Sequence, residues 1–200
     1  NQAWNLIFVA YSALYISFIH NESRKKDKIY MDIKDKIIVK DNFFKSETLE
    51  KIQNQLSAIN FTNRFNDQKN TIYQKIYFYQ NIDKDHFALK EMHDNLKTYD
   101  LKYNPDKTES SYFLSTKHKD PTPHNDDNYF NCLIYLKGEH LVNSGTGFYD
   151  VVPSNRAVIN THVGFKENRA IIFDAKLYHA SLQFSENTAT RYAMANFCYE

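Results

Sequence analysis

From about residue 105 onward, short runs of β-forming side chains alternate with turn residues, and this alternation limits the choice of fold more than anything else in the chain. All four glycines and all four prolines of the 200 residues fall between positions 105 and 164. Many short strands separated by turn signals indicate a sandwich, barrel or jelly roll. We place the predicted strands at residues 110–117, 129–136, 147–152, 158–163, 169–173 and 190–199.

The preceding segment, from residue 31 to residue 104, contains two stretches of helical periodicity. The first is predicted to start at Ser46, which we expect to cap the helix, and its apolar residues recur every three or four positions up to Ile59. The sequence therefore predicts an α+β fold, with N-terminal helices packed on a β core in one domain spanning residues 31–200. The other elements predicted in this segment are a helix at residues 85–99 and strands at residues 36–40 and 72–80.

Residues 1–30 differ from the rest of the chain. The apolar run Trp4–Ile19 is 16 residues long, whereas a membrane-spanning helix needs about 20. It has neither a basic segment before it nor a small-residue cleavage site, so it does not match a secretory signal. We expect residues 1–30 to be an N-terminal extension outside the domain. A short membrane anchor and a packed helix are the alternatives that the sequence leaves open.

Composition excludes several classes of function. The formal net charge is +1, with 25 Lys and Arg against 24 Asp and Glu, so there is no electrostatic case for a nucleic-acid partner. The chain has two cysteines and no CxxC pair, which excludes a disulfide framework and a zinc knuckle and favours a cytoplasmic location. The motifs HExxH, GxSxG, GxxxxGK[ST] and GxGxxG are absent from the sequence.

Candidate metal-binding residues lie in the β-rich half. The tripeptide His-x-Asp occurs twice, as His118/Asp120 and as His124/Asp126, and His179 follows an apolar strand 53 residues after Asp126. Two histidines and one carboxylate form the facial triad that holds non-haem Fe(II) and leaves coordination positions open. Either His-x-Asp pair, His124/Asp126 or His118/Asp120, could complete such a triad with His179.

An arginine opens the last predicted strand. Alternation along the strand places Arg191, Ala193 and Ala195 on one face. A long cation beside two small side chains leaves room for a bound anion. An edge arginine paired with a surface carboxylate is the alternative interpretation.

At these motifs the chain resembles the 2-oxoglutarate- and Fe(II)-dependent oxygenases, in particular their prolyl-hydroxylase-like branch. The matching stretches follow the family's order: PHND, FNCLIYL, SGTGFYD, NRAIIFDAKLYHA and TRYAMANF. The resemblance covers residues 110–199, and KIIVKDNFFKSETLEKIQNQL is similar to the family's opening strand and helix. It implies that the β core is a double-stranded β-helix (jelly roll).

The resemblance also implies roles for individual residues. His124, Asp126 and His179 are expected to bind Fe(II), and Arg191 is expected to pair with the distal carboxylate of 2-oxoglutarate. Where the family often has a hydroxyl-bearing residue four positions after this arginine, the chain has Ala195. Two tyrosines are candidates for contact with the cosubstrate, with a barrel-lining aromatic as the alternative role: Tyr135 and Tyr112.

The implied activity is that of a dioxygenase that uses Fe(II), 2-oxoglutarate and dioxygen, hydroxylates a substrate, and releases succinate and carbon dioxide. The substrate is a small molecule or a protein side chain that the sequence does not identify. Two alternatives remain open. One is a non-catalytic jelly-roll protein that binds a metal or a small ligand and has no need of Arg191; the other is a membrane-tethered structural module, which rests on residues 4–19 alone.

Overall fold

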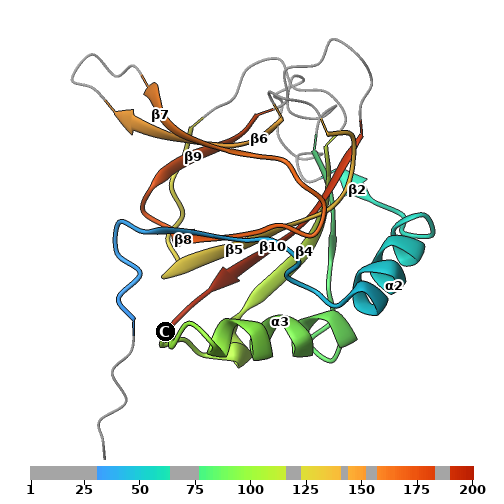
Figure 1. Cartoon of the computed structure of the whole chain (residues 1–200). Helices are drawn as coiled ribbons and strands as arrows, with labels where there is room; N and C mark the ends of the chain where they lie inside the picture. The colour runs from blue at the N-terminus through green and yellow to red at the C-terminus, as the bar shows by residue number, and fades with distance from the viewer. Residues whose placement is uncertain (1–30, 64–76, 116–122, 141–143, 152–156, 183–189) are drawn as a thin grey trace, which may run out of the picture. The chain divides into compact units, whose positions relative to one another are not determined.

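Two antiparallel sheets form the framework of the computed structural model (Figure 1). The structure describes residues 31–63, 77–115, 123–140, 144–151, 157–182 and 190–200. Within these residues, the major sheet has seven strands in the order β1 (Ile37–Lys40), β8 (Ala170–Asp174), β5 (Phe130–Lys137), β10 (Arg191–Cys198), β4 (Glu109–Ser115), β3 (Tyr77–Asn81) and β2 (Thr62–Asn63). The minor sheet has the order β7 (Ala157–Gly164), β6 (Gly145–Val151) and β9 (Tyr178–Leu182).

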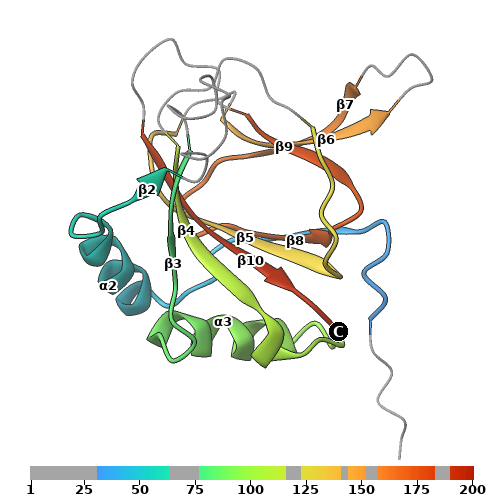
Figure 2. The same ribbon diagram turned by 180° about the vertical axis from the view of Figure 1, so that it is seen from behind.

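Two helices cover one face of the major sheet, as the views from front and back show (Figures 1 and 2). They are α2 (Ser46–Leu56) and α3 (Phe87–Lys97), and a short 3₁₀ turn, η2 (Pro105–Lys107), precedes β4. Each helix turns an apolar stripe toward the sheet, because residues three and four apart share a face. The stripes pack with Cys132, Ile134 and Met194 in one cluster of buried side chains. The helical members of that cluster are Ile52, Leu56, Ala88, Leu89, Met92 and Leu96.

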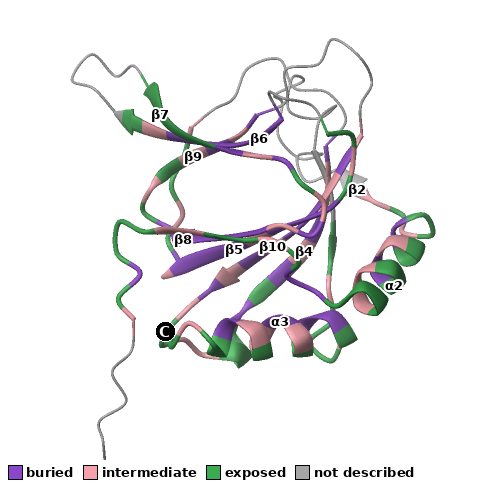
Figure 3. Ribbon diagram, in the orientation of Figure 1, coloured by how far each residue is buried: buried purple, intermediate pink, exposed green. Residues whose placement is uncertain are grey.

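A second buried cluster combines residues from strands of both sheets, and Figure 3 shows that much of β5 and β8 in the major sheet is buried. Strand β5 contributes to both clusters, since successive side chains point to opposite faces. Ile134 belongs to the helix-facing cluster, and Tyr135 belongs to the inner one. The other buried members of the inner cluster are Phe148, Val163, Phe165, Ile171, Phe173 and Ala193.

The predicted fold class, an α+β arrangement around a double-stranded β-helix, is confirmed. The six strands predicted after residue 105 correspond to β4, β5, β6, β7, β8 and β10. Each of these strands, as the structure describes it, begins and ends within two residues of its predicted bounds. Strand β9 was not predicted, because its sequence YHASL carries little β preference and pairs through its backbone with β6. Residues 31–200 form one compact unit, and the expectation for residues 1–30 lies outside the described residues.

The start of α2 corrects one local prediction. Lys45, and not Ser46, occupies the N-cap position, and no side chain of that residue caps the helix. Instead Glu91 of α3 accepts hydrogen bonds from Lys45 N at 2.6 Å and from Thr48 Oγ1 at 2.5 Å. A carboxylate at a helix N-terminus is stabilised by the helix dipole, so α3 supplies the cap that α2 lacks.

The turn before β8 fixes the first strand and the chain that follows it. Asn168 has φ 60° and its amide binds Phe44 twice, accepting from the backbone N and donating to the backbone O, each at 2.8 Å. Next to it, Arg169 forms a two-pronged ion pair with Asp41, through Nε to Oδ1 at 2.6 Å and Nη2 to Oδ2 at 3.1 Å. Asp41 directly follows β1, so these contacts hold the edge strand against β8.

Among the described residues, no helix is both long and apolar enough to span a membrane. The run Trp4–Ile19, on which the predicted anchor rests, lies outside those residues.

Candidate active site

The segment before β5 runs beside β9, and a reciprocal pair of hydrogen bonds joins the two backbones. His124 N donates to His179 O over 3.0 Å, and His179 N donates to His124 O over 2.8 Å. Two residues further on, Asp126 N donates to Ala175 O over 2.8 Å. This pairing brings together side chains that are up to 55 residues apart in the sequence.

The side chains of His124, Asp126 and His179 form a compact donor group. One ligand atom from each, two imidazole nitrogens and one carboxylate oxygen, all lie within 4.8 Å of one another. The two imidazole centroids are 4.6 Å apart, and His179 Nε2 is 3.4 Å from Asp126 Oδ2. Two imidazoles and a carboxylate at this spacing fit a divalent transition metal of the non-haem iron type.

The ring of His179 is held in the tautomer that a metal requires. Its Nδ1 lies 2.9 Å from Leu177 O, and because a carbonyl only accepts, Nδ1 carries the proton. The lone pair is therefore on Nε2, the nitrogen that faces Asp126. Burial is the largest influence on His179 and lowers its pKa, which favours the neutral ring. Phe173 packs against the ring with centroids 4.7 Å apart and fixes its plane.

Asp126 has a partner that the sequence analysis did not identify. Asn131 of β5 donates from Nδ2 to Asp126 Oδ2 over 2.7 Å. A signal for this residue was available, because Asn131 shares a face with Leu133 and Tyr135 by alternation and is the polar member of that series.

Arg191 begins β10 and is buried, with 7% of its surface exposed. Its Nη1 donates to Gly145 O and to Leu182 O, both at 3.0 Å, and to Ser144 Oγ at 3.2 Å. Its Nη2 donates to Ser181 Oγ. The guanidinium is therefore fixed by the start of β6 and the end of β9. Neither the backbone carbonyls nor the serines were predicted as its partners.

The glycine at position 145 is required by this arrangement. A Cβ there would lie 2.1 Å from Val163 O in the paired strand β7, closer than any side chain tolerates. Without a side chain, the backbone of β6 can approach β7 closely at Gly145, the residue whose carbonyl accepts a hydrogen bond from Arg191.

The donor group and Arg191 face the same interior. Ser181, which contacts the guanidinium, and His179 are alternate residues of β9, so they lie on one face about 7 Å apart along the strand. Tyr135 lies close to Arg191, with the guanidinium carbon 5.6 Å from its ring centroid, and its hydroxyl is 2.7 Å from Thr146 Oγ1. Burial raises the pKa of Tyr135, so this hydroxyl stays protonated.

Tyr112 is not brought to this group, which corrects the expectation that it contacts the cosubstrate. It lies in β4 opposite Met194 of β10, and both side chains belong to the helix-facing cluster. Its ring is 5.9 Å from that of His86, and its hydroxyl has no hydrogen-bond partner among the described residues. The residue of β4 that shares the face of Arg191 is the next one, Phe113, opposite Ala193.

The alternative pair His118/Asp120 lies outside the described residues. The choice of His124/Asp126 over that pair therefore remains a prediction, which the variants Asp120→Ala and Asp126→Ala test.

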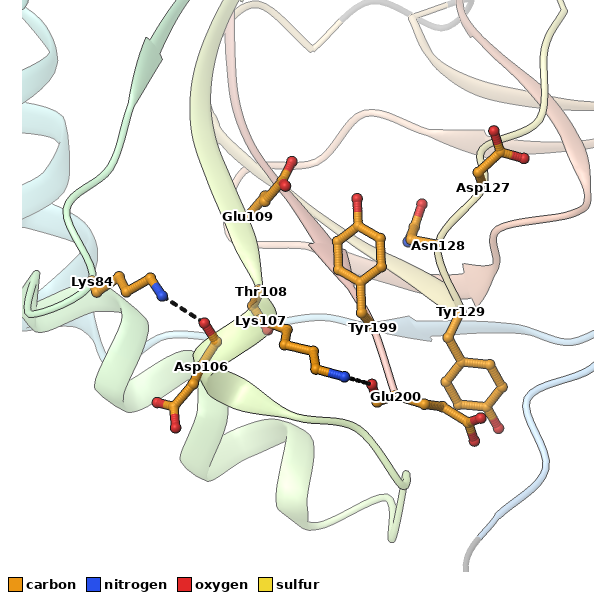
Figure 4. A pocket seen from close by; sticks show the side chains of 10 residues that line it. All are labelled: Lys84, Asp106, Lys107, Thr108, Glu109, Asp127, Asn128, Tyr129, Tyr199 and Glu200. Atoms are coloured by element: carbon orange, nitrogen blue, oxygen red, sulfur yellow. Dashed lines mark hydrogen bonds between the residues drawn. The ribbon is translucent and has the colours of Figure 1, made fainter.

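A separate pocket of about 790 Å³ lies near the end of β10 (Figure 4). Glu109, Asp127, Tyr129 and Tyr199 are among its lining residues. Two lysines at its rim bind backbone carbonyls, Lys84 to Asp106 and Lys107 to Glu200. None of the six residues predicted for the site lines this pocket, so it is not the predicted site.

Comparison with known proteins gives a structural match but no sequence match. No protein-family model and no curated protein matches the chain. A prolyl 4-hydroxylase from Pseudomonas putida matches with a TM-score of 0.54 and 10% identity, over 84% of this chain and 94% of that one. A prolyl hydroxylase from Trichoplax adhaerens matches with a TM-score of 0.56 and 14% identity, over 83% and 84% of the two chains.

A third match is HygX from Streptomyces hygroscopicus, whose structure holds nickel and 2-oxoglutarate. Its TM-score is 0.52 and its identity 13%, over 86% of this chain and 87% of that one. The chain thus has the double-stranded β-helix fold of the 2-oxoglutarate oxygenases, in the form shared by prolyl hydroxylases. At these levels of identity the likeness establishes the fold, and the activity has to be argued from the site.

Proposed function

We propose that this protein is an Fe(II)- and 2-oxoglutarate-dependent dioxygenase that hydroxylates a small molecule or a protein side chain. In this proposal His124, Asp126 and His179 bind the metal, and Arg191 binds the distal carboxylate of 2-oxoglutarate. The observation that carries it is that these groups lie along one interior face. Arg191 contacts Ser181, which follows His179 by two residues in β9 and so shares its face.

The spacing suits the cosubstrate. A five-carbon dicarboxylate has a length comparable to the distance of about 7 Å between alternate residues of a strand. One end would reach the donor group while the other meets the guanidinium fork, which matches a carboxylate with two parallel hydrogen bonds. The hydroxyl of Tyr135, protonated because it is buried, would donate a further hydrogen bond to the cosubstrate.

When bound, the iron would supply the oxidative chemistry, in which dioxygen converts 2-oxoglutarate to succinate and carbon dioxide and one oxygen atom enters a C–H bond of the substrate. The protein's own part is to bind, orient and exclude water. Phe148 and Phe173 lie beside His179 and belong, with Ile171, to the buried apolar cluster, which would help to exclude water from the site. His179 is oriented by Leu177, so its Nε2 needs no rearrangement before it meets a metal.

The similar structures bear on the substrate class, and the two cysteines bear on the location. Proteins with this fold are known with a peptide, as in the enzyme from Trichoplax adhaerens, and with hygromycin B, as in HygX. Either class would enter past His124, the exposed member of the donor group. A cytoplasmic location is supported by Cys132 and Cys198, which are both free and buried.

The decisive experiment is anaerobic addition of Fe(II) and 2-oxoglutarate. We expect the weak visible absorption band of a chelated 2-oxo acid. Asp126→Ala and His179→Ala should each abolish the band, because each removes a ligand, while Asp120→Ala should keep it. Loss of the band in Asp120→Ala but not in Asp126→Ala would assign the metal to the other His-x-Asp pair.

The same preparation separates the enzyme from a non-catalytic ligand-binding protein. In air, the enzyme should release succinate slowly without its substrate, in an amount that depends on added iron. Neither band nor succinate from the folded wild-type protein would reject the proposed function.

A further inference from the structure

We propose that Asn131 is a positioning residue for the metal site, and that Asn128 in turn orients Asn131. The inference rests on the proposed function, since it takes Asp126 as a metal ligand. Asn131 Nδ2 lies 2.7 Å from Asp126 Oδ2, and Asn128 Nδ2 lies 2.9 Å from Asn131 Oδ1. The two amides and the carboxylate thus form a short chain of hydrogen bonds within six residues of sequence.

The donors and acceptors in this series of hydrogen bonds follow from the chemistry of the side chains. An ionised carboxylate only accepts hydrogen bonds, so Asn131 must turn its NH₂ group toward Asp126. The side-chain carbonyl oxygen of Asn131 then faces Asn128, which must donate from its own NH₂ group. That group also donates to Phe130 O over 2.6 Å, which anchors the far end to the backbone of β5.

Burial makes this series of hydrogen bonds rigid. Asn128 and Asn131 are each 5% exposed, so water competes little for their hydrogen bonds. A buried amide has to be satisfied, which restricts Asn131 to the rotamer that reaches both partners. The carboxylate of Asp126 is thereby held with Oδ2 toward His179, whose Nε2 is 3.4 Å away.

The backbone alone does not provide this orientation. Asp126 N is bound to Ala175 O, and Asp126 O accepts from Lys176 Nζ at 3.0 Å, so the main chain of the loop is fixed. The side chain still rotates about two bonds. Asn131, on the rigid strand β5, supplies the contact that fixes those rotations. Groups that orient a metal ligand in this way raise metal affinity by roughly ten- to hundredfold.

The test is a titration with Mn(II), a redox-inactive probe, in the absence of 2-oxoglutarate. Free Mn(II) is measured by electron paramagnetic resonance. Asn131→Leu keeps nearly the same shape but cannot donate, so we expect its Mn(II) affinity to fall roughly ten- to hundredfold. Asn128→Ala leaves Asn131 in place without its orienting partner, and its affinity should lie between those of wild type and Asn131→Leu.

Asn196 offers a matched control in the neighbouring strand β10. It is also a buried asparagine, 1% exposed, and it donates to Cys132 O over 2.7 Å and accepts from Ser110 Oγ over 2.7 Å. Its hydrogen bonds do not involve the donor group. Asn196→Ala should therefore lower the melting temperature and leave Mn(II) affinity at the wild-type value.

The outcomes separate the inference from the function on which it rests. Wild-type protein that does not bind Mn(II) would reject both. Wild-type binding with equal affinity in Asn131→Leu and Asn128→Ala would leave the metal site standing and overturn the positioning role. Equal losses of affinity in the Asn131 and Asn196 variants would also overturn it, because general destabilisation would then account for the effect. If Asn131→Leu does not fold, Asn128→Ala decides alone.

Discussion

At the scale of single residues, Arg191 has two tasks. It ties the start of β6 to the end of β9 through carbonyls and hydroxyls, and in the proposed function it receives the cosubstrate carboxylate. The two tasks are compatible, since a guanidinium presents five N–H donors in one plane. They also mean that the residue contributes to stability as well as to binding, and an experiment has to separate the two effects.

Arg191→Leu should weaken 2-oxoglutarate binding roughly thirtyfold or more, because truncating one partner of a buried charge pair costs about 2–5 kcal/mol. Arg191→Lys should lose less, since the charge survives without the planar fork. The measurement is a titration of the visible band with 2-oxoglutarate in the folded proteins. Metal affinity without cosubstrate serves as the control and should stay close to wild type. Equal cosubstrate affinity in all three proteins would return Arg191 to a purely structural role.

Residues of the site differ in how far the sequence could identify them. Histidine, aspartate and arginine at characteristic spacing carry the resemblance to the oxygenases, so the sequence alone could name the donor group and Arg191 as candidates. The face of β5 on which Asn131 lies could be predicted by alternation, but its role could not, because its contact with Asp126 depends on how the loop before β5 folds. Tyr112 was a candidate by residue type alone, and its side chain packs in the helix-facing cluster.

At the scale of elements, the Asp41–Arg169 ion pair connects an edge strand to its neighbour. Arg169, and to a smaller extent Lys166, hold the pKa of Asp41 well below its usual range. A carboxylate with a lowered pKa in the folded state stabilises the protein above its unfolded pKa of about 4, and this contribution is lost as the pH falls below that value.

Asp41→Asn should therefore lower the melting temperature at pH 7 by about 2–4 °C, for a loss of about 1 kcal/mol in a partly exposed pair. The difference from wild type should shrink as the pH falls below about 4. Asp94→Asn is the control, because Asp94 pairs with Lys90 and Lys97 on the surface of α3 alone and joins no two elements. A difference between wild type and Asp41→Asn that is constant from pH 7 to pH 3 would contradict this assignment.

Elements with a strong apolar pattern could be predicted from the sequence, and those that form only because neighbouring segments offer backbone partners could not. Strands β5 and β8 are rich in apolar residues and are found where the sequence places them. Strand β9 exists because β6 and the segment around His124 offer it backbone partners. Its residues give no local indication of this, since the pairing joins positions at least 29 residues apart, from Tyr149↔Tyr178 upward.

At the scale of the whole molecule, the proposed ligands would link distant parts of the chain and should bind only the folded state. At a hundred times its dissociation constant, a ligand of this kind adds about 2.7 kcal/mol to stability. Mn(II) with 2-oxoglutarate should therefore raise the melting temperature by about 5–10 °C. The increase should disappear with a chelator and in Asp126→Ala. An equal increase in that variant would place the metal elsewhere.

The position of β10 has a consequence for how the chain is made. This strand follows all other described strands in the sequence but lies in the middle of the major sheet, between β5 and β4. Until the ribosome has released it, β1, β8 and β5 can form one half-sheet and β4, β3 and β2 another, each with an open edge that invites pairing with a foreign strand. Pairing across such long sequence separations is slow. Arg191 opens β10, so the step that closes the sheet also puts in place the arginine to which the proposed function assigns the cosubstrate carboxylate.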